Sequence, residues 1–180
     1  MDLLTGELED EKIVVYTRFA SLVGRLQAIL KKEGIKSTRI TGKENEAARK
    51  KNQAAFQDLD SDTKVIFITD AGSEAINLQA AIRMIFYDAP WSWGGYIQIL
   101  GRMIRIGSPH KGVLAFHLVT ERPKPEKPDR KTIDHHVLTL LRKKRGLIDK
   151  VLGEGAVGAL KFDKSGADLR GLVSAMQGRA

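Results

Sequence analysis

The chain has 180 residues, which is enough for one α/β domain with a full hydrophobic core and a smaller appendage. Lys and Arg number 30 against 22 Asp and Glu. The resulting net charge of +8 favours a polyanionic partner over an acidic one, although a basic surface can also serve solubility alone. The absence of Cys excludes disulfides and thiolate chemistry, and no stretch approaches the roughly 20 apolar residues that cross a bilayer.

The N-terminal segment Met1–Glu7 is acidic and lacks the pattern of a signal peptide. We therefore expect a soluble, cytoplasmic protein that makes no contact with a membrane. His135 and His136 are adjacent, so on a helix their side chains point in different directions. We predict that they are surface residues and that the chain has no metal site of its own.

Short apolar runs alternate with helical patterns along the first 120 residues. Strands are predicted at Ile13–Tyr16, Thr38–Ile40, Lys64–Thr69, Arg83–Tyr87 and Val113–Val119. Helices are predicted at Arg18–Glu33, at Glu46–Phe56 and in the segment Tyr96–Gly107. This alternation predicts an α/β fold, in which parallel strands are joined by right-handed crossovers and helices flank a mainly parallel sheet.

The composition changes after residue 120, which divides the chain into a main domain, 1–120, and three further parts. Residues 121–131 hold three of the five prolines and many charges, so they are predicted to form an exposed linker. Residues 132–152 have apolar residues at helical spacing, and the basic run Arg142–Arg145 within them is either a solvated helix face or an additional nucleic-acid contact. Residues 153–180 are rich in Gly and Ala and are predicted to be a flexible tail.

One segment of the main domain combines apolar residues with three polar ones. Gln98, Arg102 and Arg105 are spaced i, i+4 and i+7, so on a helix they share one face. Guanidinium groups stay charged at any working pH and bind phosphate oxygens through a rigid fork, so this face suits a polyvalent anion. The alternative from spacing alone is an amphipathic helix with a solvated polar side.

The pattern Q-x-x-G-R-x-x-R-x-G resembles the arginine-finger motif of superfamily-two helicases, and its R-I-G form is especially similar to Swi/Snf-type DNA translocases. The resemblance runs in order from Lys12 to Leu152. It implies a RecA-like three-layer domain, the second lobe of a two-lobed motor, with a C-terminal bracing helix. It further implies that Arg102 and Arg105 are catalytic and that Gln98 contacts the nucleotide.

The loop after the central strand, Thr69–Leu78, carries groups that suit a nucleotide or phosphate. A threonine hydroxyl and a glycine amide at a strand end can bind phosphate oxygens, and Asn77 can bond a ribose hydroxyl, although a plain strand-to-helix turn is the alternative. The loop resembles the family motif T-x-A-G-x-x-G-x-N-L, which implies that Gly72 and Asn77 contact nucleotide and Thr69 contacts nucleic acid. Ala75 replaces a family glycine, so we expect it to preserve the loop unless its φ is positive.

Two further strand ends resemble nucleic-acid contacts of the family. They are Arg18, after the first strand, and the turn Thr41–Gly42, after the second. The resemblance implies contacts to the backbone of double-stranded DNA, because phosphate contacts position a protein without reading bases. Trp91 matches the tryptophan of the family's D-x-x-W-N-P segment and is otherwise a core aromatic residue.

A complete motor also needs G-x-x-x-x-G-K-[ST] and an acidic pair, and neither appears in this chain. The resemblance therefore implies half of an ATPase: ATP and Mg²⁺ are held mainly by an N-terminal RecA-like lobe absent from this chain, and the isolated lobe is inactive. Three alternatives remain open. They are a lobe of a strand-separating DNA or RNA helicase, a nucleic-acid-binding module that has lost catalysis, and a nucleotide-free α/β protein with a basic surface.

Overall fold

The computed structural model describes residues 8, 11–104, 112–121 and 132–152, with the side chains of the last range placed only to residue 145. The chain divides into two compact units, which are described separately. The first contains residues up to Asp88 and the range Gln98–Leu118, and the second contains Ala89–Ile97 and the residues from Val119 onward. Arg105 and the predicted tail lie outside the described residues, as does nearly all of the predicted linker.

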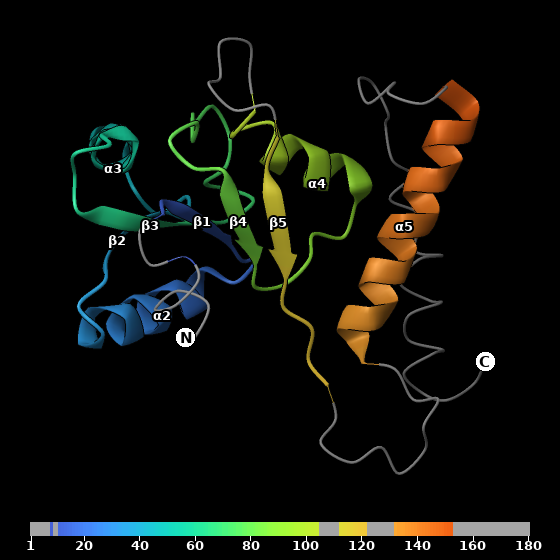
Figure 1. Ribbon diagram of the computed structural model, residues 1–180, viewed down its shortest axis with the longest axis horizontal. Coiled ribbons are helices and arrows are strands. Elements are labelled where there is room, and N and C mark those ends of the chain that lie inside the picture. The colour runs from blue at the N-terminus through green and yellow to red at the C-terminus, as the bar shows by residue number, and fades with distance from the viewer. Residues whose placement is uncertain (1–7, 9–10, 105–111, 122–131, 153–180) are drawn as a thin grey trace. The chain divides into compact units, whose positions relative to one another are not determined.

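The first unit is built on a five-stranded, entirely parallel sheet in the order β2-β3-β1-β4-β5 (Figure 1). The strands are β1 (Ile13–Tyr16), β2 (Lys36–Ile40), β3 (Thr63–Ile68), β4 (Arg83–Phe86) and β5 (Leu114–His117). All five strands predicted from the sequence are present, with ends that differ by two residues at most. The predicted α/β class with a parallel sheet is therefore confirmed.

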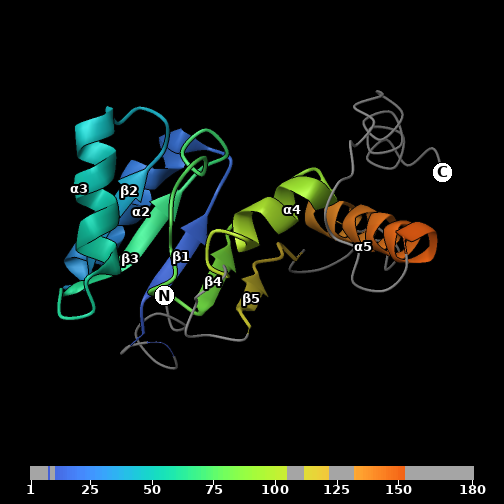
Figure 2. The ribbon, with the colours of Figure 1, turned by 90° about the horizontal axis from the view of Figure 1, so that it is seen from above.

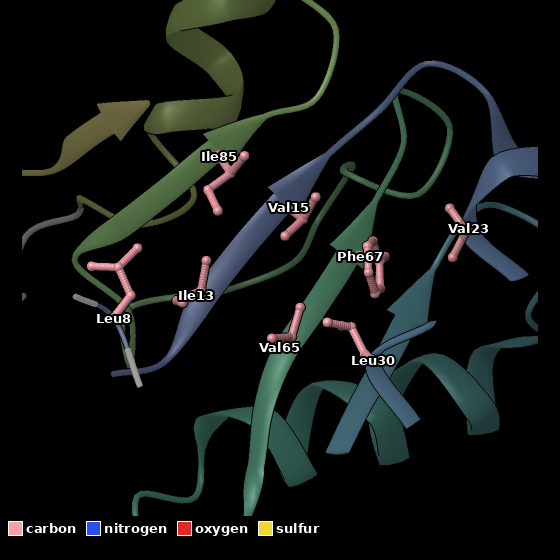
Figure 3. Packing of buried hydrophobic residues seen from close by; sticks show 8 residues of the cluster. All are labelled: Leu8, Ile13, Val15, Val23, Leu30, Val65, Phe67 and Ile85. Carbon is pink, nitrogen blue, oxygen red and sulfur yellow. The ribbon is translucent and has the colours of Figure 1, made fainter. Parts of the chain in front are cut away.

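Helices cover both faces of this sheet. Figures 1 and 2 show α2 (Ala20–Lys32) and α3 (Glu46–Gln57) on opposite sides of it. Successive side chains of β1 point to opposite faces, and both faces are covered, so β1 is buried at every position. On one face Ile13 and Val15 join a core cluster with residues of α2, β3 and β4 (Figure 3).

Local sequence signals explain where the two helices stop and start. Gly34 follows α2 with φ +75°, a left-handed conformation that glycine adopts without steric cost. The side chain of Asn45 caps α3 by accepting a hydrogen bond from the Ala48 N–H at 2.9 Å. α3 contributes Phe56, which is fully buried, to the core.

The helix predicted to carry both arginines is shorter than expected. α4 spans Trp93–Leu100 and ends before Arg102, which lies in a turn, so the prediction that Gln98 and Arg102 share one helix face is wrong. Gly101 is a weak helix former, and the Arg102 N–H bonds the Ile99 carbonyl in the tighter i→i−3 pattern at 3.1 Å. The Arg102 carbonyl accepts from the Leu78 N–H at 2.8 Å instead of continuing the helix.

The second unit contains the long helix α5 (Ile133–Leu152), which matches the helix predicted over 132–152. Val137 and Leu141 of α5 are buried and pack with Trp93 in a small apolar cluster. The Asp134 carboxylate accepts a hydrogen bond from the Thr120 N–H at 2.8 Å. The bracing role of α5 stays a prediction, as do the predicted domain limits. Among the described helices, none is long and apolar enough to cross a membrane.

Candidate nucleotide and nucleic-acid site

Polar residues follow the strands at one edge of the sheet in the first unit. Thr17, Thr41 and Thr69 come directly after β1, β2 and β3, and all three are buried. Because the strands are parallel, their carboxyl ends meet at the same edge, where ligands of open α/β sheets bind. The predicted site residues Arg18, Thr41, Gly42, Thr69 and Gly72 are therefore all found in segments that leave this edge.

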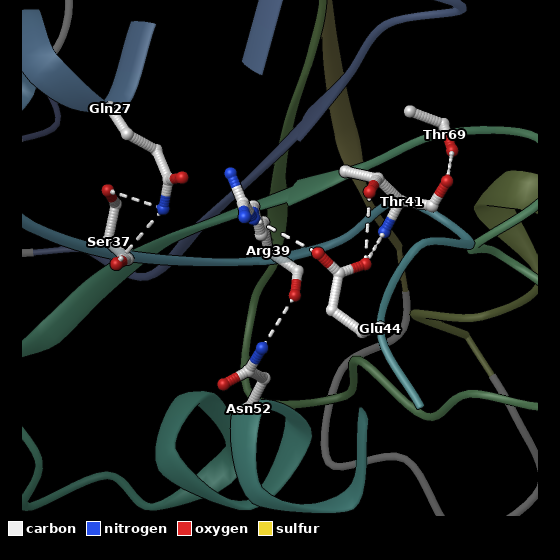
Figure 4. Close-up of polar contacts among 7 residues, drawn as sticks. All are labelled: Gln27, Ser37, Arg39, Thr41, Glu44, Asn52 and Thr69. Atoms are coloured by element: carbon white, nitrogen blue, oxygen red, sulfur yellow. Dashed lines mark hydrogen bonds and ion pairs between the residues drawn. The ribbon is translucent and has the colours of Figure 1, made fainter. Parts of the chain in front are cut away.

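The ends of β2 and β3 are in direct contact. The Thr69 hydroxyl donates to the Thr41 carbonyl at 3.0 Å (Figure 4). A side chain at Gly72 would place its Cβ 1.8 Å from the Ile40 carbonyl oxygen, so only glycine fits between the loop and β2. Gly42 has φ +86°, which lets the chain reverse directly after Thr41.

A carboxylate occupies the donors at the end of β2. Glu44 Oε2 accepts from the Thr41 N–H at 2.7 Å and from the Thr41 hydroxyl at 3.0 Å, and Glu44 Oε1 pairs with Arg39 Nε at 3.0 Å (Figure 4). Burial of the carboxyl group acts to raise its pKa, but the Thr41 hydrogen bonds and the Arg39 charge outweigh it. The pKa of Glu44 is therefore lowered. The end of β2 thus stabilises an anion.

A second carboxylate organises the ends of β1 and β4. Asp88 Oδ2 accepts from the Thr17 hydroxyl, and Asp88 Oδ1 accepts from both the backbone N–H and Nε of Arg18 at 3.0 Å. The Arg18 and Asp88 side chains are only 20% and 13% exposed, so the pair is largely desolvated. This network fixes the direction of the Arg18 side chain at the carboxyl edge.

The loop after β3 is held along its length by one face of α3. Arg49 Nη2 donates to the Gly72 and Glu74 carbonyls at 3.2 and 2.7 Å. Gln53 Oε1 accepts from the Asn77 N–H at 3.3 Å, and Gln57 Oε1 accepts from the Ala80 N–H at 2.9 Å. Arg49, Gln53 and Gln57 have the spacing i, i+4, i+8, so they lie on one face of α3. These bonds satisfy main-chain groups that an irregular loop cannot pair by itself.

The arginine segment meets this loop. The Leu78 N–H donates to the Arg102 carbonyl at 2.8 Å, which brings Arg102 next to Asn77 in the chain fold. Asn77 and Gln79 form two hydrogen bonds with each other. Asn77 Nδ2 donates to Gln79 Oε1 at 2.8 Å, and the Gln79 N–H donates to Asn77 Oδ1. Two of the segments predicted to contact nucleotide are therefore in contact with each other.

The Arg102 side chain is left without an internal partner among the described residues. Its Nε is buried and makes no hydrogen bond, and no ion pair neutralises its guanidinium within that part of the chain. A buried donor without a partner is costly unless a ligand supplies one. Gln98 is exposed.

Some of these contacts could not be found from the sequence alone. Asp88 binds Arg18 across 70 positions of the chain, a separation that carries no local signal. The stripe formed by Arg49, Gln53 and Gln57 does have a signal in its helical spacing, although the spacing does not say what the stripe binds. Glu44 also has a sequence signal, because T-x-x-E is the spacing at which a glutamate reaches back to a threonine N–H.

Comparison with known proteins identifies the family. Residues 1–107 match the helicase conserved C-terminal domain. The chain belongs to this family. YqhH, an uncharacterized ATP-dependent helicase of Bacillus subtilis, is 30% identical over 145 residues, which cover 81% of this chain and 24% of YqhH.

Two solved structures share the fold of this helicase C-terminal domain. The C-terminal part of the Fun30 ATPase domain superposes with a TM-score of 0.64 at 23% identity, covering 78% of this chain and 42% of that one. The Sulfolobus solfataricus SWI2/SNF2 ATPase core in complex with dsDNA gives 0.61 at 24% identity, covering 87% and 31%. The fold is therefore that of SWI2/SNF2 ATPase lobes, and the predicted RecA-like class is confirmed.

Proposed function

We propose that this chain is the C-terminal motor lobe of a DNA-dependent ATPase that translocates along double-stranded DNA. The chain spans about a quarter of the length of YqhH. Because this sequence contains no G-x-x-x-x-G-K-[ST] motif, the proposed ATP hydrolysis uses a first lobe that supplies the phosphate-binding loop. The dsDNA bound to the SWI2/SNF2 relative supports duplex DNA as the track. The net charge of +8 supports a polyanionic partner within the cell.

The observation that carries the proposal concerns Arg102, whose guanidinium has no partner among the described residues and whose backbone contacts the loop of Asn77. Its carbonyl accepts from the Leu78 N–H at 2.8 Å, while its buried Nε makes no hydrogen bond among the described residues. A charged donor held in place without a partner suits a phosphate that arrives from outside. In the proposal Arg102 and Arg105 stabilise the charge that develops on the transferring phosphoryl group.

The remaining nucleotide contacts are proposed for Gly72, Asn77 and Gln98. Gly72 places backbone at the sheet edge without a side chain, and Asn77 is held by Gln79 so that its amide faces a defined direction. No group of three carboxylates or histidines that could hold a cation occurs among the described residues. Mg²⁺ is therefore assigned to the ATP phosphates and the first lobe, where it would neutralise phosphate charge.

Contacts to the DNA backbone are proposed for Arg18, Thr41, Gly42 and Thr69, at the ends of β1, β2 and β3. Gly42 is exposed, and Arg18 is directed by Asp88 at 3.0 Å. The buried Thr69 acts through Thr41, because its hydroxyl fixes the Thr41 carbonyl. Such contacts bind phosphates whatever the base sequence, which suits a protein that moves along the duplex.

The test is DNA-stimulated ATP hydrolysis by the motor assembled from this chain and its first lobe. Arg102→Ala should lower kcat by about 10³-fold or more, the usual size of an arginine-finger effect. Arg25→Ala, an exposed charge on α2, is the matched control and should leave kcat unchanged. Equal rates for both variants would refute the proposed role, and a strand-displacement assay on the same motor distinguishes translocation from unwinding.

A further inference from the structure

We propose that Arg39 and Thr41 form a phosphate-binding cradle that the Glu44 carboxylate fills until a backbone phosphate of nucleic acid displaces it. The inference rests on the proposed function, because it concerns the same carboxyl edge of the sheet. It adds a second cationic contact, Arg39, and it assigns Glu44 as an internal competitor of the ligand. Glu44 then sets how tightly the lobe binds DNA.

The cradle is defined by three donors that converge on one carboxylate. They are the Thr41 N–H at 2.7 Å, the Thr41 hydroxyl at 3.0 Å and Arg39 Nε at 3.0 Å (Figure 4). A backbone amide, a hydroxyl and a guanidinium are the donor types that proteins use for phosphate oxygens. A carboxylate and a phosphodiester each present two oxygens that share one negative charge, so they can occupy the same donors in turn.

The backbone that carries these donors is held in place by contacts that do not involve Glu44. The Arg39 carbonyl accepts from Asn52 Nδ2 at 2.8 Å, and the Thr41 carbonyl accepts from the Thr69 hydroxyl at 3.0 Å. Arg39 also belongs to β2, whose register with β3 pairs it with Phe67. The backbone of the cradle therefore keeps its position when the carboxylate leaves, which lowers the cost of exchanging one anion for another.

The position of Glu44 in the chain allows its carboxylate to leave the cradle. It lies in the turn between β2 and α3, and α3 begins only at Glu46, so its movement does not unwind the helix. Gly42, with φ +86°, supplies the reversal that folds the carboxylate back over Thr41. The Arg39 side chain is 45% exposed, which gives a phosphate access to the cradle from solvent.

The stability of an anion at this position agrees with the geometry. The pKa of Glu44 is lowered although burial acts to raise it, because the Thr41 donors and the Arg39 charge favour the ionised form. Glu46, two residues away, pairs with Lys50 on the surface, and its side chain is 81% exposed. It carries the same charge outside the cradle, and it provides a matched control.

The test measures binding of a fluorescently labelled DNA duplex to the full chain at low ionic strength by polarisation. Glu44→Gln keeps the shape and one acceptor for Thr41 but removes the competing charge, so it should bind about fivefold more tightly than the wild type or better. Glu46→Gln removes an equal charge in a screened position and should change affinity by less than about twofold. Thermal unfolding of both variants checks that the fold is intact.

The result depends on Thr41 if Glu44 acts by filling the cradle. In a Thr41→Val background, which lacks the hydroxyl donor, the gain from Glu44→Gln should shrink, whereas a general charge effect would persist. Equal gains from Glu44→Gln and Glu46→Gln would overturn the cradle while leaving the proposed DNA contact standing. Absence of duplex binding by both the wild type and Glu44→Gln would overturn the proposed DNA contact and the cradle together.

Discussion

Ala75 has a backbone conformation that its side chain disfavours. Its φ is +53°, and it is the only residue other than glycine with positive φ among the described residues. The left-handed conformation costs an L-amino acid roughly 1–2 kcal/mol, whereas glycine adopts it freely. The condition under which the sequence predicted a disturbed loop is therefore met.

Replacing Ala75 by glycine should consequently stabilise the lobe. Relief of about 1–2 kcal/mol is opposed by the roughly 0.4–1 kcal/mol of additional chain entropy that glycine brings to the unfolded state. Ala75 is exposed, so no core contact is lost. The net expectation is a gain of about 0.5–1 kcal/mol in the free energy of unfolding, measured by urea denaturation.

Ala71→Gly provides the control within the same loop, since Ala71 is exposed and does not have a positive φ. It carries the entropy cost without relief of strain, so it should destabilise the lobe by about 0.4–1 kcal/mol. Each substitution removes one alanine methyl group, and the two should change the free energy of unfolding in opposite directions. Destabilisation by both would refute the argument that strain is stored at Ala75.

Four more outcomes are expected. Gly72→Ala should lower the free energy of unfolding by more than about 3 kcal/mol in urea, because its Cβ would lie 1.8 Å from the Ile40 oxygen. Asp88→Asn should cost about 2–3 kcal/mol in the same assay, since an amide nitrogen cannot accept from the donors on Thr17 and Arg18. Gln57→Met should speed hydrogen exchange of the Ala80 amide by about tenfold, and Lys51→Met should not. The lowered pKa of Glu44 stabilises the fold above its usual pKa of 4.5, and this contribution is lost as the pH falls through the lowered value; acid titration of the unfolding midpoint should show a smaller loss in Glu44→Gln.

The sheet could be predicted because its information is local. Ile13–Tyr16 and Val65–Ile68 are continuous apolar runs, and a strand buried on both faces requires an apolar residue at every position. The helix caps are local signals as well, since Gly34 and Asn45 act within their own turns. The carboxyl edge followed from these elements, because the loops that follow parallel strands all leave from the same edge of the sheet.

The end of α4 could not be predicted in the same way. Helical spacing extends through Arg102, but the Leu78 N–H draws the Arg102 carbonyl out of the helix, and that partner lies 24 residues earlier in the sequence. A tertiary hydrogen bond therefore outweighed the local pattern, helped by Gly101. The consequence for the proposed site is that loop contacts position Arg102, while helical periodicity does not.

The same helix, α3, holds both halves of the proposed site. Asn52 donates to the Arg39 carbonyl at 2.8 Å beside the cradle, while Arg49 and Gln57 bond the loop that contacts Arg102. A shift of α3 against the sheet would break bonds at both ends, and a helix resists internal stretching through its own hydrogen bonds. The distance between the phosphate cradle and the nucleotide loop is therefore fixed within the lobe. In the proposed motor, a step along DNA then comes from movement between the two lobes, because α3 holds the cradle and the nucleotide loop of this lobe at a fixed separation.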